Sequence, residues 1–538
     1  MPATARGDGV SDEKSKNGDS SNSHLQPHRK EVSPTQWGVA APCSSETFKT
    51  RRHDHKPLAK NWDHRLTPES ASRTGSSLKA AFKHLQNPDV ISLGGGLPPS
   101  DYFPLSAITL TVPPLNPSPQ TDANPATPAP HHHLHATKHD LSHTLSPYDL
   151  TTALNYSQSN GSAPLLRWLT EHTEHLHNPP YADWACTATI GNTSALDMAL
   201  RMFARRGDAV LADAYTFSSA VETAAPMGVR FVGVDMDEQG MVPGSLRRVL
   251  ETWEEGAREG ERGGARRPGL LYVVPTGQNP TGVTQGVERR REIYRVAQEW
   301  DLIVLEDDPY YFLQLDLPGT GEGAGRGPRT PEQLLERLVP SYLSMDTDGR
   351  VVRMDSFSKV VFPGARVGWI TASQQIVEQY KHHADVSTQG PAGLSQLALF
   401  KLLDEHWGHA GYLSWLLHIR SEYTRRRDFT IEACERYLPA GIVSWKPAEA
   451  GMFQWLKVDC SSHPHVKSKT AAEIEEEVWL ESIKRGALVA RGSWFRVPDD
   501  RPHRDVYFRI TFAAASLDKI AEAVRRFGNA VHELFHRG

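Results

Sequence analysis

The chain has 538 residues and a formal net charge of -5, with 59 Lys and Arg against 64 Asp and Glu. This length allows two or more domains with large cores, and the near balance of charge gives no sign of a nucleic-acid-binding face. The four cysteines lack CxxC spacing and no run of about 18 apolar residues occurs, which argues against zinc sites, disulfide frameworks and membrane spans.

Residues 1–60 are polar and rich in Ser, Asp, Lys and His, so we expect a disordered tail. Its beginning has no apolar stretch typical of a signal peptide, and its acids are unlike transit peptides, which favours a cytoplasmic protein. We expect residues 61–155 to form the N-terminal part of a small domain, with a Pro/His-rich insertion near 110–145. The insertion contains HHHLH, but histidines in such a loop are more often solvated, and we expect no metal.

From 156 to 385, short apolar segments alternate with helical patterns. That alternation predicts a large α/β domain whose mostly parallel sheet is covered on both faces. The segments that we interpret as strands are AVLAD (209–213), RFVGVD (230–235), LLYVV (270–274), LIVLE (302–306) and VGWIT (367–371). From 386 to 538, longer helical patterns and two short strands predict a smaller α+β domain.

Two loops of the large domain place polar groups beside predicted helix or strand ends. The segment 189–203, TIGNTSALDMALRMF, predicts a helix whose N-terminus, with Asn192 and Thr193, is suited to an anion. The loop 273–282, VVPTGQNPTG, follows a predicted strand and presents Asn279, at the end of a sheet where ligands bind in α/β proteins. Taken alone, an ordinary helix cap and a turn asparagine explain both segments well.

Two further segments carry ionisable side chains. Asp308 ends an apolar strand in EDDPYY, with Tyr311 three residues later, although Asp-Asp-Pro is also a common turn. In DSFSKVVFPGARVGW, Lys359 lies in apolar surroundings and Arg366 follows it. Such surroundings lower the pKa of a lysine and make its amine a nucleophile toward carbonyl groups, whereas a lone lysine is usually solvated. Together, an anion cradle, a carboxylate, a phenol, an amide and a reactive lysine match the needs of pyridoxal 5'-phosphate (PLP).

Six motifs in chain order carry a resemblance that extends over about 65–535, apart from the insertions. The chain resembles the fold-type I PLP-dependent aminotransferases of the kynurenine/2-aminoadipate and fungal aromatic amino acid family. The resemblance implies the PLP-dependent transferase fold, with a mostly parallel seven-stranded sheet between helices and a smaller α+β domain. The motifs are ISLGGGLPPSDYFP, YSQSNGSAPLLRWL, GQNPTG, EDDPYYFLQ, DSFSK with GARVGW, and YFRITFA.

Carried over residue by residue, the resemblance implies a role for each matching position in binding PLP. Lys359 would be joined covalently to the cofactor, and Asp308 would pair with its ring nitrogen. Asn279 and Tyr311 would bind the ring oxygen, while Tyr215 would stack on the ring. The residues implied around the phosphate are Asn192, Thr193, Ser356, Ser358 and Arg366, joined by Tyr156 from the neighbouring subunit of a homodimer.

The resemblance also implies the contacts of the substrate. Gly96 would touch it, and Arg509 in YFRITFA would bind its α-carboxylate. A guanidinium on a short apolar strand needs an anionic partner, and a substrate carboxylate fits its planar fork. The alternative is a salt bridge between Arg509 and a carboxylate of the protein itself.

The implied activity is transamination from an aromatic amino acid, with kynurenine or 2-aminoadipate as further donors, to 2-oxoglutarate or another 2-oxo acid. Lys359 would serve as general base and then acid for the proton on Cα. Two alternatives stay open: another PLP-dependent reaction such as a β-elimination, and an aminotransferase-like regulator. The regulator requires a helix-turn-helix domain, for which residues 1–60 have no helical apolar periodicity.

Overall fold

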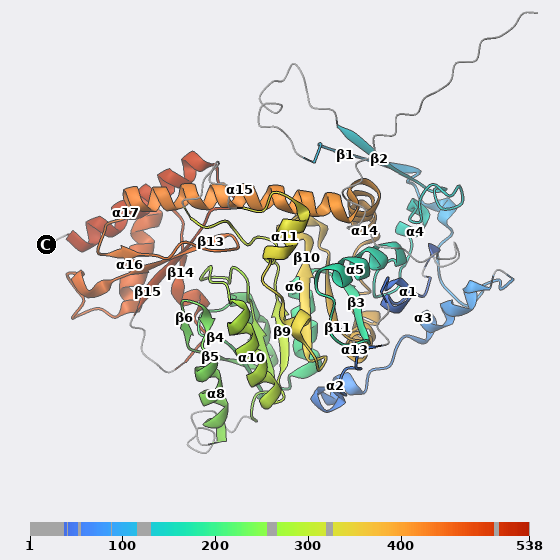
Figure 1. The fold of residues 1–538 in the computed structure, drawn as a ribbon, viewed down its shortest axis with the longest axis horizontal. Coiled ribbons are helices and arrows are strands. Elements are labelled where there is room, and N and C mark those ends of the chain that lie inside the picture. The colour runs from blue at the N-terminus through green and yellow to red at the C-terminus, as the bar shows by residue number, and fades with distance from the viewer. Residues whose placement is uncertain are drawn as a thin grey trace, which may run out of the picture.

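The structure, a computed structural model, describes residues 37–39, 41–51, 55–87, 89–115, 131–254, 266–318, 327–499 and 505–536. Figure 1 shows a large α/β part in the middle and a smaller α+β part, built from C-terminal residues, at the left end. The long helix α15 (Gly408–Tyr437) runs from one part to the other. No helix within the described ranges is both long and apolar enough to span a bilayer.

The large sheet has seven strands in the order β3-β11-β10-β9-β8-β4-β5. The pairs β10–β9, β9–β8, β8–β4 and β4–β5 are parallel, whereas β11 runs antiparallel to β10 and β3. The predicted mostly parallel seven-stranded sheet is therefore confirmed. The strands are β3 (Trp184–Thr189), β4 (Ala209–Asp213), β5 (Arg230–Val234), β8 (Leu270–Val273), β9 (Ile303–Asp307), β10 (Val351–Ser356) and β11 (Gly368–Ser373).

Successive strand residues point into two cores on opposite faces of this sheet. Tyr272 and Leu305 belong to one core, and their neighbours Leu271 and Val304 belong to the other. Because both faces are buried, the strands are continuous apolar runs rather than alternating ones. The first face packs against α5 (Ala163–Leu176), α6 (Gly191–Phe203), α7 (Ser218–Ala224) and α13 (Gln374–Asp385), and the second against α8 (Pro243–Glu251), α10 (Val287–Glu299) and α12 (Tyr342–Met345).

The C-terminal part is built on a four-stranded antiparallel sheet in the order β12-β13-β15-β14. Its apolar side chains pack against α15, α16 and α17 in a core of their own. Two shorter helices, α11 (Pro331–Arg337) and α14 (Gly393–Phe400), and a π-helical segment (Lys401–Trp407) precede α15. The remaining bounds are β12 (Val443–Ser444), β13 (Phe453–Val458), α16 (Ala471–Lys484), β14 (Ala490–Arg491), β15 (Val506–Thr511) and α17 (Leu517–His536).

The N-terminal residues differ from the prediction in two ways. The described residues from Trp37 onward are ordered: Trp37 stacks on Phe48 of α1 (Ser45–Phe48), and both are buried in the core of the large part. The expectation of a disordered tail as far as residue 60 is therefore wrong, because two aromatic anchors suffice to dock a segment of polar composition. Residues 1–36 lie outside the described residues.

Residues 61–155 do not complete the C-terminal domain. The helix α2 (Pro68–Ala71) contacts α6 and α13, and α4 (Leu150–Ala153) contacts α14. Figure 1 shows these elements, with α3 (Ser77–Ala81), at the end of the molecule opposite the C-terminal sheet. The predicted assignment of this segment to the small domain is therefore corrected, since its contacts run to the helices around the large sheet.

The predicted insertion contains a β-hairpin. Its strands β1 (Ala107–Val112) and β2 (His132–Thr137) are antiparallel, and residues 116–130 between them lie outside the described residues. The histidines of HHHLH therefore lie mainly on β2, where His133 and His135 bond to threonines of β1. No group of three or more potential metal ligands occurs among the described residues. A second two-stranded sheet joins β6 (Met236–Asp237) to β7 (Gly240–Met241).

Candidate active site

The carboxyl ends of β8, β9 and β10 meet the N-terminus of α6 at one edge of the large sheet. This is the edge where open α/β sheets bind ligands. A cavity of about 220 Å³ lies there. Seven of the residues predicted from the sequence line it: Asn192, Thr193, Asn279, Ser356, Ser358, Lys359 and Arg366.

Lys359 ends a short 3-10 turn, Phe357–Lys359, that directly follows β10. Ser356 caps this turn, because its hydroxyl accepts a hydrogen bond from the Ser358 backbone N–H at 3.1 Å. The amine is half-buried, and burial is the main cause that lowers its pKa. Arg366 and Arg509 lower the pKa further, whereas Asp307 opposes them. Burial therefore shifts Lys359 toward the neutral form, which is the nucleophilic form of an amine.

Asp307, the last residue of β9, supplies the buried carboxylate of the cavity. Its Oδ1 accepts a hydrogen bond from Asn192 Nδ2 at 2.7 Å, and its Oδ2 accepts one from Tyr272 Oη at 2.8 Å. Burial raises the pKa of Asp307, and these two donors with Arg353 and Lys359 oppose that rise. The side chain of Asn192 thus orients this carboxylate, and the predicted role of this residue toward phosphate stays a prediction.

An anion cradle lies between the start of α6 and Arg366. Gly191 has a φ of +75°, and a Cβ added there would lie 2.6 Å from Arg366 Nη2. The guanidinium of Arg366 donates only to the carbonyl oxygens of Pro363 and Ile190, at 3.2 and 3.4 Å, among the described residues. The Ser356 and Ser358 hydroxyls lie 2.9 Å apart on the same cavity wall. A glycine, two hydroxyls and an exposed guanidinium together fit a phosphate group.

Arg509 reaches the site from β15 of the C-terminal domain. Its Nη1 donates to Asn279 Oδ1 at 2.6 Å, and the guanidinium lies 4.1 Å from the Phe453 ring centroid and 4.6 Å from that of Phe495. Burial lowers its pKa, with Tyr310 opposing. Within the described part of the chain no carboxylate pairs with Arg509, which argues against the alternative of an internal salt bridge.

Asp308 and Tyr311 lie outside this cavity, contrary to their predicted roles. Asp308 is buried against Thr276, whose hydroxyl donates to it at 3.0 Å, and against Arg353, 3.3 Å away. The ring of Tyr311 lies 4.6 Å from the same guanidinium. The preceding residues, Asp307 and Tyr310, line the cavity instead. For the two aspartates the reason is that successive residues at the end of β9 face opposite sides of the sheet, whereas the two tyrosines lie in the turn that follows.

Three other predicted residues do not line the cavity. Tyr215 faces a separate space of about 1010 Å³ between the two parts, where it packs against Trp455 and Tyr507, and Phe217 lines the lysine cavity in its place. Tyr156 is 59% exposed and Gly96 has open space around it. Because Tyr156 was expected to act in a neighbouring subunit, a single chain leaves its role a prediction.

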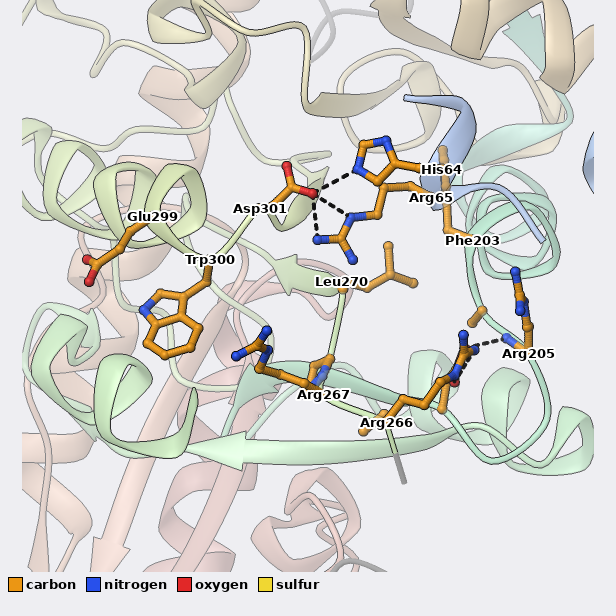
Figure 2. Close-up of a pocket in the computed structure, with 15 residues that line it drawn as sticks. His64, Arg65, Phe203, Arg205, Arg266, Arg267, Leu270, Glu299, Trp300 and Asp301 are labelled. Carbon is orange, nitrogen blue, oxygen red and sulfur yellow. Dashed lines mark hydrogen bonds and ion pairs between the residues drawn. The ribbon is translucent and has the colours of Figure 1, made fainter. Parts of the chain in front are cut away.

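Figure 2 shows a further cavity of about 620 Å³, located where β4 and β8 begin, at the opposite edge of the sheet from Lys359. Its walls are rich in arginine, but much of that charge is paired. Arg65 and His64 both bind Asp301, and Arg266 binds Asp208 through two nitrogens. No lysine, serine or cysteine occurs among its described lining residues, so it offers no amine, hydroxyl or thiol of these types for covalent catalysis.

The cavity around Lys359 thus combines an amine whose pKa is lowered by burial, a buried carboxylate and an anion cradle, with an arginine from a second domain beside it. Such a set suits covalent catalysis on a carbonyl group, and the fold and the site together define an enzyme of the aminotransferase type. The model of the family "Aminotransferase class I and II" matches residues 149–527. The chain belongs to this family.

Two curated relatives and one solved structure are similar over most of the chain. An aromatic amino acid aminotransferase of Schizosaccharomyces pombe is 42% identical over 481 residues, which cover 88% of this chain and 98% of the relative. An L-tyrosine:2-oxoglutarate aminotransferase of Tapinella panuoides is 37% identical, over 76% of each chain. The crystal structure of aminotransferase Aro8 from Candida albicans superposes with a TM-score of 0.81 and 38% identity, covering 89% of this chain and all of that one.

Proposed function

We propose that this aminotransferase uses PLP to move the amino group of aromatic amino acids to 2-oxoglutarate. The observation that carries the proposal is the Lys359 amine, half-buried with a lowered pKa, in one cavity with the buried carboxylate of Asp307. The relatives named for aromatic amino acids and for tyrosine with 2-oxoglutarate support the choice of substrates. Kynurenine and 2-aminoadipate are further donors to be tested.

The residues that line the cavity offer a suitable partner for each polar group of PLP. Lys359 would hold it covalently, and Asp307 would pair with its ring nitrogen. Tyr310 and Asn279 would bind its ring oxygen, and Phe217 would cover the ring. Thr193, Ser356, Ser358 and Arg366, which line the same cavity, would bind its phosphate. When bound, PLP supplies an electron sink that makes the substrate Cα–H bond acidic.

The chain's own residues then bind the substrate and move its proton. Arg509 would bind the α-carboxylate, oriented by its bond to Asn279, so that Cα is turned toward the lysine. Lys359 Nζ would take the proton from Cα and later return it, and burial, by lowering its pKa, makes the amine easier to deprotonate than an exposed lysine. Tyr272 and Asn192 would keep Asp307 fixed and hydrogen-bonded throughout.

We expect Lys359→Ala to retain non-covalent PLP while turnover falls by at least about 100-fold, since both the covalent link and the proton-transfer group are lost. The assay mixes purified protein, PLP, tyrosine or phenylalanine and 2-oxoglutarate, and measures glutamate. Borohydride reduction of the wild-type protein followed by peptide mapping should place the cofactor on Lys359. A label on another residue, or full turnover in the variant, would refute the assignment.

We further propose that the chain forms a homodimer. Large apolar side chains between residues 91 and 156 are exposed in the single chain: Leu93 is 96% exposed, Ile91 87%, Tyr102 82% and Tyr156 59%. Large apolar side chains exposed to this degree are typical of a surface that is covered by another protein. A second copy of this chain would cover this surface and would bring its Tyr156 to the phosphate, as the resemblance implies.

A further inference from the structure

A fully buried ionic cluster lies directly behind the carboxylate that faces Lys359. At its centre, Arg353 Nη1 lies 2.9 Å from Glu306 and 3.3 Å from Asp308, while Nη2 and Nε bind Asp355 at 2.8 and 2.9 Å. The ring of Tyr311 covers the guanidinium at 4.6 Å. The guanidinium of Arg353 thus contacts the carboxyl groups of three acidic residues.

The cluster connects the two strands that carry the candidate catalytic groups. Glu306 and Asp308 flank Asp307 at the end of β9, and Arg353 is paired with Glu306 in the parallel register of β9 and β10. Asp355 lies on β10 immediately before the turn that ends at Lys359. Because residues alternate in direction along a strand, the cluster holds one face of both strand ends while the opposite face presents Asp307 to the cavity.

Stability alone is a poor reason for such a cluster. Replacing a buried ionic group by apolar residues of similar volume is often neutral or stabilising, because the charges must be stripped of water. The groups that face Asp308 act on its charge in opposite directions. Arg353 and Arg290 favour the ionised carboxylate, whereas Glu306 and Asp355 disfavour it, and the charge of Asp308 in turn raises the pKa of Tyr311. Accordingly burial raises the pKa of Asp308 to about 7 and that of Asp355 to about 6.

We propose that Arg353 is a positioning residue for the transamination site: by holding Glu306, Asp308 and Asp355 together, it fixes Asp307 relative to Lys359. The inference rests on the proposed function. Without Arg353, Glu306, Asp308 and Asp355 lose the donor that they share, and the side chains at the ends of β9 and β10 are no longer tied to one another. Asp307 then loses its fixed place opposite the lysine amine, whereas Arg509, on another domain, keeps its position.

The test compares Arg353→Met with Arg350→Met in the full-length chain. Arg350 is a matched control, because it is also fully buried, precedes the same strand, and binds Asp348 and the carbonyls of Ala297 and Leu302 at the far end of β10. Hydrogen exchange without added cofactor should rise in peptides spanning 305–310 and 354–360 only for Arg353→Met. This readout does not depend on activity.

With cofactor, Arg353→Met should lower kcat by about 100-fold, the loss expected for a catalytic group displaced by about 1 Å, with a much smaller change in KM for the amino acid. The pH titration of the bound cofactor's absorbance should shift as well. Arg353→Lys, which keeps the charge but cannot bridge three carboxylates, should fall between wild type and Arg353→Met. If Arg353→Met does not fold, Arg353→Lys carries the same readouts.

Equal behaviour of the Arg353 and Arg350 variants in exchange and in cofactor titration would overturn the proposal, because both would then be structural. So would an Arg353→Lys variant that is indistinguishable from wild type. Failure of the proposed function looks different: wild-type protein would bind no PLP and form no glutamate. The exchange comparison between the two methionine variants would still decide whether Arg353 fixes the strand ends.

Discussion

Two neighbouring carboxyl groups at the end of β9 have opposite surroundings. Asp307 faces the cavity and accepts bonds from Asn192 and Tyr272, whereas Asp308 faces Arg353 and Thr276 on the other side. Under the proposed function, only the first touches the cofactor. The chemistry of the site therefore depends on which way each of two identical side chains points.

We expect Asp307→Asn to lower kcat by about 100-fold or more, because the charge opposite the cofactor ring is lost where no water replaces it. Asp308→Asn, the matched control one residue away, should lose far less, since Arg353 keeps Glu306 and Asp355 as partners. Steady-state kinetics with tyrosine and 2-oxoglutarate measure both variants. The reverse order of losses would restore Asp308 as the ring-nitrogen partner.

Asp308 also gives a prediction for stability against pH. Its pKa rises from an ordinary value of 3.8 to about 7 in the folded chain. Between these values the folded state holds a proton that the unfolded state has released, so this group's contribution to stability falls as the pH rises through that window. Asp308→Asn has no proton to release at this position, so it does not lose stability in this window.

The stability of Asp308→Asn relative to wild type, measured as the difference in free energy of unfolding, should therefore be larger at pH 8 than at pH 5. Urea denaturation at the two pH values measures the difference. Parallel pH profiles for the two proteins would show that Asp308 is ionised in the folded state at both.

The sequence identified most of the cavity residues through motifs, but it could not orient EDDPYY. In a strand exposed on one face, polar and apolar residues alternate and reveal the direction of each side chain. Both faces of β9 are buried, so Ile303 to Leu305 give no alternation from which to read the faces of Asp307 and Asp308. Tyr310 and Tyr311 lie in the turn after β9, where no strand periodicity indicates the direction of a side chain.

At the scale of elements, the backbone of the loop after β8 packs directly against the backbone of the C-terminal domain. Gly277 has a φ of +53°, and a Cβ there would lie 2.5 Å from the backbone nitrogen of Gly451 and 2.6 Å from the carbonyl carbon of Ala450. Asn279, which orients Arg509, follows two residues later. The two glycines thus let one domain place its amide against the arginine of the other.

Gly277→Ala should destabilise the protein by about 2 kcal/mol or more, through backbone strain and the clash with Gly451. It should also raise KM for the amino acid, because Asn279 and Arg509 are pushed apart. Gly286→Ala is the control, since a Cβ at Gly286 meets nothing within 4 Å. Urea denaturation and steady-state kinetics measure both effects, and equal stability of the two variants would contradict the close approach.

Among the strands, the apolar ones were predictable and two polar ones were not. β10, with the sequence VVRMDS, contains Arg353 and Asp355, which are buried only because they pair with each other and with β9. β3, WACTAT, is built largely from alanine and threonine. Pairing between distant segments cannot be read from the composition of one segment, so both strands were missed.

At the scale of the whole molecule, the exposed apolar segment around Leu93 predicts the assembly. Replacing Ile91 and Leu93 together by Asp should weaken the homodimer by at least about tenfold, since charges would be buried in an apolar contact. Leu58→Asp, at a side chain 71% exposed elsewhere, is the control. Sedimentation velocity over a dilution series measures the change, and unaltered association would place the interface elsewhere.

The order of segments in the chain was a poor guide to their neighbours in space. Trp37 and Phe48 dock on the large part although their surroundings are polar, and the segment after them stays with that part rather than joining the C-terminal sheet. Average composition reports the mean solubility of a stretch, whereas docking depends on a few large side chains. By contrast, each of the five continuous apolar segments that we interpreted as strands coincides with a strand of the large sheet to within about two residues.

Among the described residues, the guanidinium of Arg509 has one hydrogen-bonding partner, the side-chain amide of Asn279. An amino acid brings the missing counterion with it, whereas the amine made by decarboxylating that amino acid brings none. Under the proposed function, tyramine would therefore leave a bare guanidinium among aromatic rings while tyrosine would neutralise it. Discrimination between metabolites of nearly identical shape then needs no steric gate.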